Sequence, residues 1–318
     1  MTRSNHRKNP LSKLSTNVWQ YLSLATLRLG YRLGFTFAPG YAAERAARIF
    51  LTPQRRAPAH LPEPQGGATP FELEFHGGEL HAWSWGPHNL QAVPTVLVVH
   101  GWEDDHRGMT PLVDRLTWSG FRVVALDLPG HGRSDGRLAP IPQLAEAVAA
   151  VARLIGPLEA IVAHSLGGTA AMIAMTELGV VAQRAVILAS PNHPEHFARG
   201  IAGFIGLNEA GFQRMRLAIE RLAGRPMQAL HLPPLLRRLN LPALFVHDRA
   251  DRVVPLQHSR DNVDAWRGAR LEIVEGMGHR RILSDPAVIE RVRAFVAGET
   301  AKAELFSMAK PTRYAARA

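Results

Sequence analysis

Residue 165 is a serine in a pattern typical of catalytic nucleophiles. The segment AHSLG spans residues 163–167 and follows the apolar run LEAIV. In the best-known pattern of this kind, G-x-S-x-G, the serine lies on a tight turn between a strand and a helix. Side chains two positions before and after such a serine must be small, because a larger one would collide across the turn. Ala163 adds only one methyl group to the glycine of the pattern, so the sequence predicts that Ser165 is a nucleophile.

Serine is a poor nucleophile at neutral pH and needs a base that takes its proton. His279, which follows the flexible segment GMG, is the candidate base. An aspartate that accepts a hydrogen bond from the imidazole would stabilise the imidazolium that forms. Two candidates, Asp248 and Asp251, lie in another part of the chain. Residues suited to acyl transfer therefore occur in the chain order Ser, Asp, His.

Apolar runs that alternate with helical segments predict how these residues are positioned. Six runs rich in β-branched residues predict strands covered on both faces, at residues 95–101, 121–130, 158–165, 185–190, 242–248 and 269–276. Helices are predicted between and after them, at residues 110–119, 141–155, 166–178, 256–266 and 286–297. This alternation favours a parallel sheet with crossover helices. Chemistry in such sheets lies beyond the carboxyl ends of the strands, where the serine, the aspartate and the histidine are all found.

Three further features complete the predicted domain organisation. The alternating segment 71–85 predicts a β-hairpin that turns at Gly77-Gly78. About fifty residues with helical periodicity separate two of the strands, and we expect a helical cap insertion at about 192–240. The predicted parts are a basic N-terminal extension and linker (1–67), a main domain (68–298) and a C-terminal tail (299–318).

The net charge of +10 is concentrated in the extension. Residues 1–60 hold ten Lys and Arg and a single acid, Glu44, whereas residues 61–298 are nearly neutral. The high charge is therefore no sign that the main domain binds nucleic acid, and no nucleic-acid partner is expected. The chain has no cysteine, which excludes disulfides and thiolate chemistry.

The extension contains a helical stripe with two possible roles. Its apolar members recur at helical spacing, at Leu14, Val18, Leu22, Ala25 and Leu29. Arg28 and Arg32 interrupt the apolar run, which argues against a membrane span and a signal peptide, so we expect a cytoplasmic protein. The first possible role of the stripe is packing, on the parent domain or on a second subunit. The second is peripheral contact with an anionic membrane.

With these features the chain resembles the α/β-hydrolase family. The elements that carry the resemblance are the AHSLGG turn, the order Ser165, Asp251, His279, the segment HGW (100–102) and the segment DLPGHGRS (127–134). The resemblance covers about residues 71–298. It implies an α/β-hydrolase fold with a mostly parallel, doubly wound sheet, helices on both faces and a helical cap insertion.

The resemblance also implies roles for single residues. It selects Asp251 rather than Asp248 as the acid of the triad, and it assigns the oxyanion hole to the backbone N–H groups of Trp102 and Leu166. His100 and the segment 127–132 are interpreted as structural. His164 neighbours the nucleophile, but its position on the turn is expected to point its side chain elsewhere. No metal-ligand spacing and no nucleotide-binding fingerprint occurs, so neither a metal nor a cofactor is expected.

A serine nucleophile leaves several acyl-transfer reactions open. The predicted cap is rich in apolar residues, namely Phe197, Ile201, Phe204, Ile205, Leu207, Phe212 and Met215. We therefore expect a hydrolase of small-molecule carboxylic esters with a hydrophobic acyl or alcohol part, which acts through an acyl-enzyme. An acyltransferase or a thioesterase with the same triad is the alternative within enzymes. Outside enzymes, the alternative is a binding protein that keeps this fold without turnover.

Overall fold

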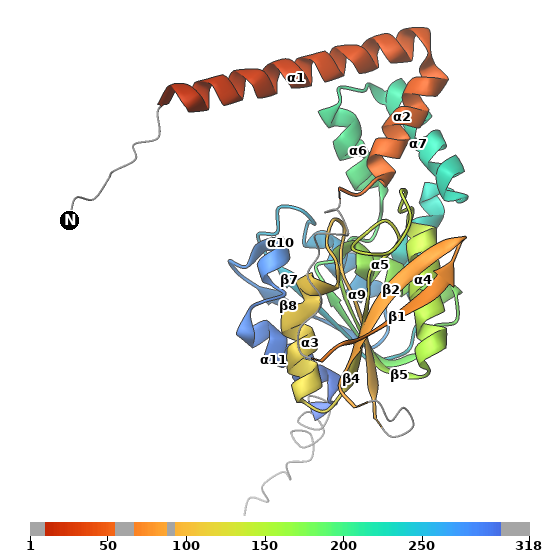
Figure 1. Cartoon of the computed structure of the whole chain (residues 1–318), viewed down its shortest axis with the longest axis vertical. Coiled ribbons are helices and arrows are strands. Elements are labelled where there is room, and N and C mark those ends of the chain that lie inside the picture. Colours follow the sequence, from red (N-terminus) through yellow and green to blue (C-terminus); the bar gives the residue numbers. More distant parts are fainter. Residues whose placement is uncertain (1–9, 55–66, 88–92, 300–318) are drawn as a thin grey trace, which may run out of the picture. The chain divides into compact units, whose positions relative to one another are not determined.

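A computed structural model describes residues 10–54, 67–87 and 93–299, with the backbone alone for residues 10–23. Residues 55–66, in the last part of the predicted extension and linker (1–67), and most of the tail predicted at 299–318 lie outside these residues. The chain forms two compact units (Figure 1). One joins the chain up to Leu51 with Glu195–Met227, and the other holds Thr52–Pro194 and the chain from Gln228. Each unit is described by itself.

The second unit is built on one sheet, which has eight strands among the described residues. Their bounds are β1 (Thr69–Phe75), β2 (Gly78–Trp85), β3 (Thr95–Val99), β4 (Arg122–Leu126), β5 (Leu158–His164), β6 (Ala182–Leu188), β7 (Ala243–Asp248) and β8 (Ala269–Val274). The order across the sheet is β1-β2-β4-β3-β5-β6-β7-β8. The strands from β3 to β8 pair in parallel, and the predicted hairpin β1–β2 adds an antiparallel edge.

Helices cover both faces of this sheet, as the sequence predicts (Figure 1). Their bounds are η2 (His106–Met109), α3 (Thr110–Trp118), α4 (Ile141–Ile155), α5 (Ser165–Glu177), η3 (Met227–Leu230), α8 (Leu232–Leu236), α9 (Gln257–Ala265), α10 (Gly278–Arg281) and α11 (Pro286–Val296). Each of the five helices predicted for this unit is present, with ends that differ from the prediction by at most one residue.

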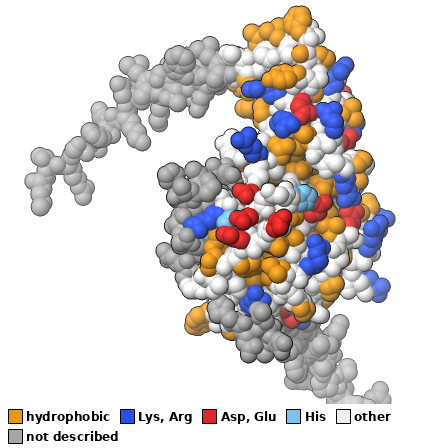
Figure 2. Space-filling view, turned by 45° about the vertical axis from the view of Figure 1, so that its right-hand side comes forward, with side chains coloured by type: hydrophobic (Ala, Val, Ile, Leu, Met, Phe, Trp, Pro, Cys, Tyr) orange, Lys and Arg blue, Asp and Glu red, His pale blue; other side chains and the backbone are white. Residues whose placement is uncertain are grey.

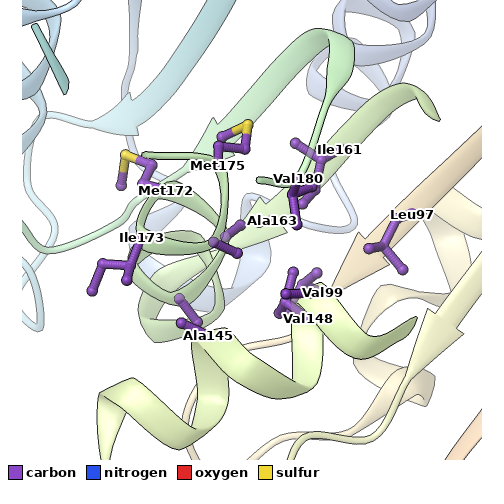
Figure 3. Packing of buried hydrophobic residues seen from close by; sticks show 14 of the residues in the cluster. Leu97, Val99, Ala145, Val148, Ile161, Ala163, Met172, Ile173, Met175 and Val180 are labelled. Atoms are coloured by element: carbon purple, nitrogen blue, oxygen red, sulfur yellow. The ribbon is translucent and has the colours of Figure 1, made fainter. Parts of the chain in front are cut away.

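Alternate residues of the strands enter two separate hydrophobic clusters. Leu97 and Val99 of β3 pack on the face of α4 and α5, whereas Val96 and Val98 pack on the face of α3 and α11. Figure 3 shows the first cluster, in which side chains of β3, β5, α4 and α5 meet. Burial of one such side chain contributes roughly 1.5–3 kcal/mol relative to its exposure to water. The two clusters therefore hold the strand ends in place, where the candidate site residues begin.

The first unit combines the N-terminal helices with the insertion between β6 and β7. Its helices are α1 (Pro10–Phe37), α2 (Pro39–Leu51), α6 (Glu195–Phe204) and α7 (Glu209–Ala223). α2 packs against α7 and buries four alanines, whose small side chains let the helix backbones approach closely: Ala42, Ala43, Ala46 and Ala47. The Arg221 guanidinium lies 2.7 Å from the Glu44 carboxylate across this contact. The extension and the insertion, which are separate in the sequence, thus form one packed unit.

The insertion is shorter than the predicted range 192–240. Of the predicted range, only Glu195–Met227 belongs to the first unit. The residues that follow return to the second unit, because Leu230, Leu232, Leu236 and Leu239 are buried in its larger hydrophobic cluster. Among the described residues, no helix combines the length and the apolar character that a membrane crossing requires.

A larger residue at position 46 tests the packing of α2 on the insertion. Ala46 is fully buried, so Ala46→Leu should overpack this contact at a cost of about 1–3 kcal/mol. Trypsin cleavage after Arg45 and Arg48 should become faster, because α2 detaches more often. The control Ala25→Leu adds the same atoms at an exposed position of α1. Equal cleavage rates in the two variants would contradict this packing.

Candidate active site

Ser165, His279 and Asp251 meet at the carboxyl ends of β5, β8 and β7. The Ser165 hydroxyl oxygen lies 2.9 Å from Nε2 of His279. Nδ1 of His279 lies 2.8 Å from Oδ2 of Asp251. The Asp251 side chain is fully buried and that of His279 is 10 % exposed. The structure thus joins the three predicted residues in one chain of hydrogen bonds that is largely shielded from water.

The turn that carries Ser165 has an unusual backbone. Ser165 directly follows β5 as the first residue of α5, and its φ angle is +52°. A residue other than glycine in this left-handed region costs about 1–3 kcal/mol, which the surrounding structure must offset. Gly101, in the loop after β3, leaves room for the turn, since a Cβ there would stand 2.9 Å from the Cβ of Ser165.

The close contact that requires a small residue lies at Gly167. A Cβ on Gly167 would collide with the carbonyl oxygen of His100, at the end of the neighbouring strand. Ala163, in contrast, is fully buried in the hydrophobic cluster, where its methyl group packs (Figure 3). The requirement for a small side chain therefore does not come from a collision across the turn itself, as the sequence analysis argued. The constraint is the approach of α5 to β3, and it tolerates alanine at position 163.

Asp251 is held as a carboxylate. Burial would raise the pKa of Asp251, but hydrogen bonds from His247, from His279 and from the backbone N–H groups of Val253 and Val254 outweigh it and lower this pKa far below its usual range. An ionised Asp251 accepts the Nδ1–H of His279 and so leaves Nε2 as the acceptor for the Ser165 hydroxyl proton.

The second aspartate of this loop has a different task. Asp248 accepts hydrogen bonds from the backbone N–H groups of Ala250 at 2.7 Å and of Met277 at 2.6 Å. It therefore ties the loop after β7 to the loop after β8. The structure brings Asp251, and not Asp248, to the imidazole of His279.

The predicted oxyanion-hole residues border the serine. Leu166 follows Ser165 in the first turn of α5, where backbone N–H groups have no partner within a helix. Trp102 follows Gly101 in the loop that lies against Ser165, and its half-buried ring meets the ring of His131 edge-on. An oxyanion formed beside Ser165 would face the positive end of the α5 helix dipole.

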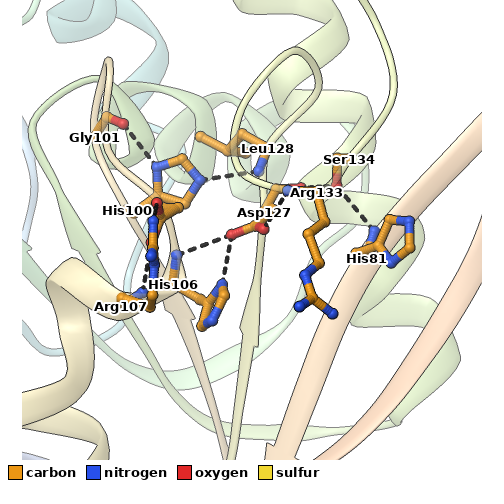
Figure 4. A network of polar contacts seen from close by, with 10 residues as sticks. His81, His100, Gly101, His106, Arg107, Asp127, Leu128, Arg133 and Ser134 are labelled. Atoms are coloured by element: carbon orange, nitrogen blue, oxygen red, sulfur yellow. Dashed lines mark hydrogen bonds and ion pairs between the residues drawn. The ribbon is translucent and has the colours of Figure 1, made fainter. Parts of the chain in front are cut away.

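His100 joins the loop after β3 to the loop after β4. Its Nε2 accepts the N–H of Leu128 at 3.0 Å, and its Nδ1 donates to the Gly101 carbonyl at 2.7 Å (Figure 4). The ring is fully buried. In agreement with the sequence analysis, the observed bonds of His100 are structural, and they hold the loop that carries Trp102.

A buried carboxylate beside this loop has a partner that the sequence analysis missed. Asp127 lies 2.8 Å from Nδ1 of His106 and accepts the backbone N–H groups of His106 at 2.9 Å and Arg133 at 2.8 Å (Figure 4). Asp105, His106 and Asp127 bring possible metal-ligand atoms within 4.8 Å of one another, but Asp105 pairs with Arg107. Hydrogen bonds within the protein therefore account for this cluster. No spacing in the sequence relates His106 to Asp127.

His164 contacts the backbone of the candidate base. Its Nε2 lies 2.9 Å from the carbonyl oxygen of His279, and the centroids of the two imidazole rings are 4.8 Å apart. Burial, followed by the neighbouring His279, lowers the pKa of His164 to about 3. His164 is therefore neutral near pH 7 and donates Nε2–H to this carbonyl. The sequence analysis expected this side chain to point elsewhere, but it lies against the candidate base and holds the loop of His279.

The pKa of His164 predicts how stability depends on pH. Because the ordinary pKa of 6.5 falls to about 3 in the folded state, only the unfolded chain binds this proton between these values. The contribution to stability is complete above pH 6.5 and is lost as the pH falls toward 3, with a slope of at most about 1.4 kcal/mol per pH unit. His164→Gln keeps a donor without this titration. Urea unfolding should show a shallower decline from about pH 6.5 to about pH 4.5 in the variant; parallel declines would contradict the assignment.

The contact at Gly167 predicts a selective loss of stability. Gly167→Ala should lower the free energy of unfolding by about 2–3 kcal/mol, because its Cβ meets the His100 carbonyl oxygen. Gly200→Ala is the control, since a Cβ there meets no atom within 4 Å and its helix should gain up to about 1 kcal/mol. Urea denaturation of both variants tests this contrast. A Gly167→Ala protein as stable as the wild type would show that α5 and β3 are less close than observed.

Comparison with known proteins identifies the family to which this site belongs. The model of the alpha/beta hydrolase family matches residues 96–292. A serine hydrolase-like protein from Danio rerio is 36% identical over 112 residues, which make up 33% of this chain and 32% of that relative. This match thus spans about a third of the relative's length. A non-heme haloperoxidase from Rhodococcus erythropolis is 25% identical over 260 residues, with coverage of 66% of this chain and 92% of the relative.

Solved structures agree at the level of the fold. Est1E from Butyrivibrio proteoclasticus, solved with ferulic acid bound, has a TM-score of 0.60 and 19% identity, with coverage of 73% of this chain and 99% of that one. A putative lipase from Acinetobacter baumannii has a TM-score of 0.57 and 18% identity, with coverage of 74% and 93%. The family match spans more than half of the chain and includes Ser165, Asp251 and His279. The chain therefore belongs to the alpha/beta hydrolase family of hydrolytic enzymes.

Proposed function

We propose that this protein hydrolyses carboxylic esters through an acyl-enzyme formed on Ser165. The observation that carries the proposal is the continuous hydrogen-bond chain from Ser165 through His279 to Asp251, with distances of 2.9 Å and 2.8 Å. The left-handed backbone of Ser165 supports it, since a strained serine between a strand and a helix is the geometry of a nucleophile elbow.

The arrangement suits a two-step reaction. Nε2 of His279 accepts the hydroxyl proton as the Ser165 oxygen bonds to the ester carbonyl carbon. The carbonyl oxygen then carries the negative charge, and the backbone N–H groups of Trp102 and Leu166 stabilise it. When the carbon–oxygen bond to the alcohol breaks, His279 returns the proton to the leaving alcohol. Water then attacks the acyl-enzyme by the same route, which releases the acid and restores Ser165.

The buried carboxylate makes the proton transfer favourable. Asp251 stays ionised and faces Nδ1 of His279, so it stabilises the imidazolium that exists between the two proton transfers. Backbone N–H donors at the oxyanion are worth about 10²–10³ in turnover each. These contributions come from groups that the fold already orients, and none of them needs a cofactor.

The proposed preference for hydrophobic esters rests on a part of the insertion. Phe212 and Met215 are buried within the first unit, so their apolar character is explained by packing. Phe204 is 55% exposed, and Phe197 and Ile201 are half-buried. These three side chains leave apolar surface on the insertion, and this apolar character is the basis of the proposed preference.

Hydrolysis of p-nitrophenyl esters from acetyl to dodecanoyl tests the proposal. The wild type should release p-nitrophenol, and Ser165→Ala should lose on the order of 10⁶ in kcat because no nucleophile remains. Ser284→Ala, which changes a serine at another place in the chain, should keep wild-type activity. The profile over acyl length measures the hydrophobic preference.

Each of the other possible results of this assay would indicate a different function. Equal activity in the wild type and Ser165→Ala would overturn the assignment of the nucleophile. If no ester is cleaved, the same proteins are assayed with acyl-coenzyme A thioesters and with an added alcohol acceptor, which detect thioesterase and acyltransferase activity. Absence of every activity in a folded wild type would favour a binding protein of this fold.

A further inference from the structure

One side of α1 presents a row of apolar side chains to water. Leu29, Leu33 and Phe37 recur every four residues, so they lie on the same side of the helix. They are 56%, 49% and 80% exposed, whereas Tyr31 is only 5% exposed. Tyr41, at the start of α2, is 69% exposed as well. Hydrophobic side chains gather where α1 and α2 join, at the top of Figure 2.

Such a row is unusual on a protein surface. Single exposed apolar residues are common, but contiguous apolar patches mark surfaces that contact a partner or a membrane. The helix has 28 residues and is therefore about 42 Å long, enough to rest along a surface.

Positive charge accompanies the row. Residues 1–60 contain ten Lys and Arg and one acid, Glu44. That acid pairs with Arg48 and Arg221 on the contact of α2 with α7, and Arg32 has no part in these pairs. Arg32 is exposed and directly precedes Leu33, at the border of the row. An apolar strip with Arg32 at its border matches a surface that offers both hydrocarbon and negative charge.

We propose that the row Leu29, Leu33 and Phe37 docks α1 onto an anionic lipid surface. The helix lies parallel to the membrane, its apolar side chains enter the boundary between headgroups and acyl chains, and Arg32 reaches the lipid phosphates. A second copy of the chain is the weaker occupant, because it would bring the same positive charge against α1. The proposal concerns where the protein resides and does not depend on the reaction at Ser165.

Co-sedimentation of the full chain with vesicles tests this docking. The vesicles are pure phosphatidylcholine or contain one-third phosphatidylglycerol. We expect binding to the anionic vesicles alone, and weaker binding when salt is raised from about 0.15 M to about 1 M, where the screening length falls to about 3 Å. The triple variant Leu29→Ser, Leu33→Ser, Phe37→Ser should bind at least about tenfold more weakly.

A matched control separates this row from apolar surface in general. Trp118, Leu154 and Val181 are 85%, 55% and 73% exposed on the second unit. Their replacement by serine should leave vesicle binding unchanged, and circular dichroism of both triple variants checks that they fold. The proposal is overturned if the wild type ignores anionic vesicles, or if the α1 variant binds as the wild type does. A concentration-dependent dimer that the α1 variant abolishes, without vesicle binding, would assign the row to a second copy.

Discussion

The close approach of α5 to the end of β3 is the constraint on which the candidate site depends. Gly167 packs against the His100 carbonyl oxygen, and Gly101 packs against Ser165. These two contacts, each possible only without a Cβ, allow Ser165 to keep its left-handed backbone. The strain of about 1–3 kcal/mol is offset by the hydrophobic clusters on both faces of the sheet. Packing several residues away thus offsets the backbone strain of a nucleophile at a sharp turn.

Buried charges hold the loops that surround this turn. Asp127 accepts hydrogen bonds from the loop after β3 and from its own loop after β4, while Asp248 joins the loops after β7 and β8. Asp251 occupies the remaining position, where it meets His279. Asp248 and Asp251 have hydrogen-bond donors that replace water, which is why burial does not neutralise them. His164 shows the opposite outcome, because burial keeps its imidazole neutral and therefore able to donate to the His279 backbone.

The two helices of the N-terminal extension make different contacts. Alanines on α2 let it pack tightly on α7 of the insertion, and the ion pair of Glu44 and Arg221 lies across this contact. The row on α1 remains exposed and is bordered by arginine. Packing and the proposed docking surface are therefore separated along the extension. The two roles inferred from its helical stripe, contact with the parent chain and contact with a membrane, need not compete.

The order of elements in the main domain followed from the sequence alone. Strands covered on both faces must be apolar throughout, so their runs are visible without a structure, and every predicted strand and helix of the main domain is present. Ser165, His279 and an aspartate were found because parallel strands end at one edge of the sheet. The choice of Asp251 over Asp248 came from a family resemblance, and the hydrogen bonds of the structure separate the two.

Other features were decided by tertiary contacts between residues far apart in the chain. His106 meets Asp127, His164 meets the His279 backbone, and α2 meets α7, but no local pattern links these partners. The end of the insertion was misplaced for the same reason, since Leu232 and Leu236 look helical wherever they pack. Local sequence determines which elements form and where chemistry begins, because propensity and periodicity act over a few residues. Hydrogen-bond partners and domain boundaries depend on which buried surfaces meet, and only the folded chain decides that.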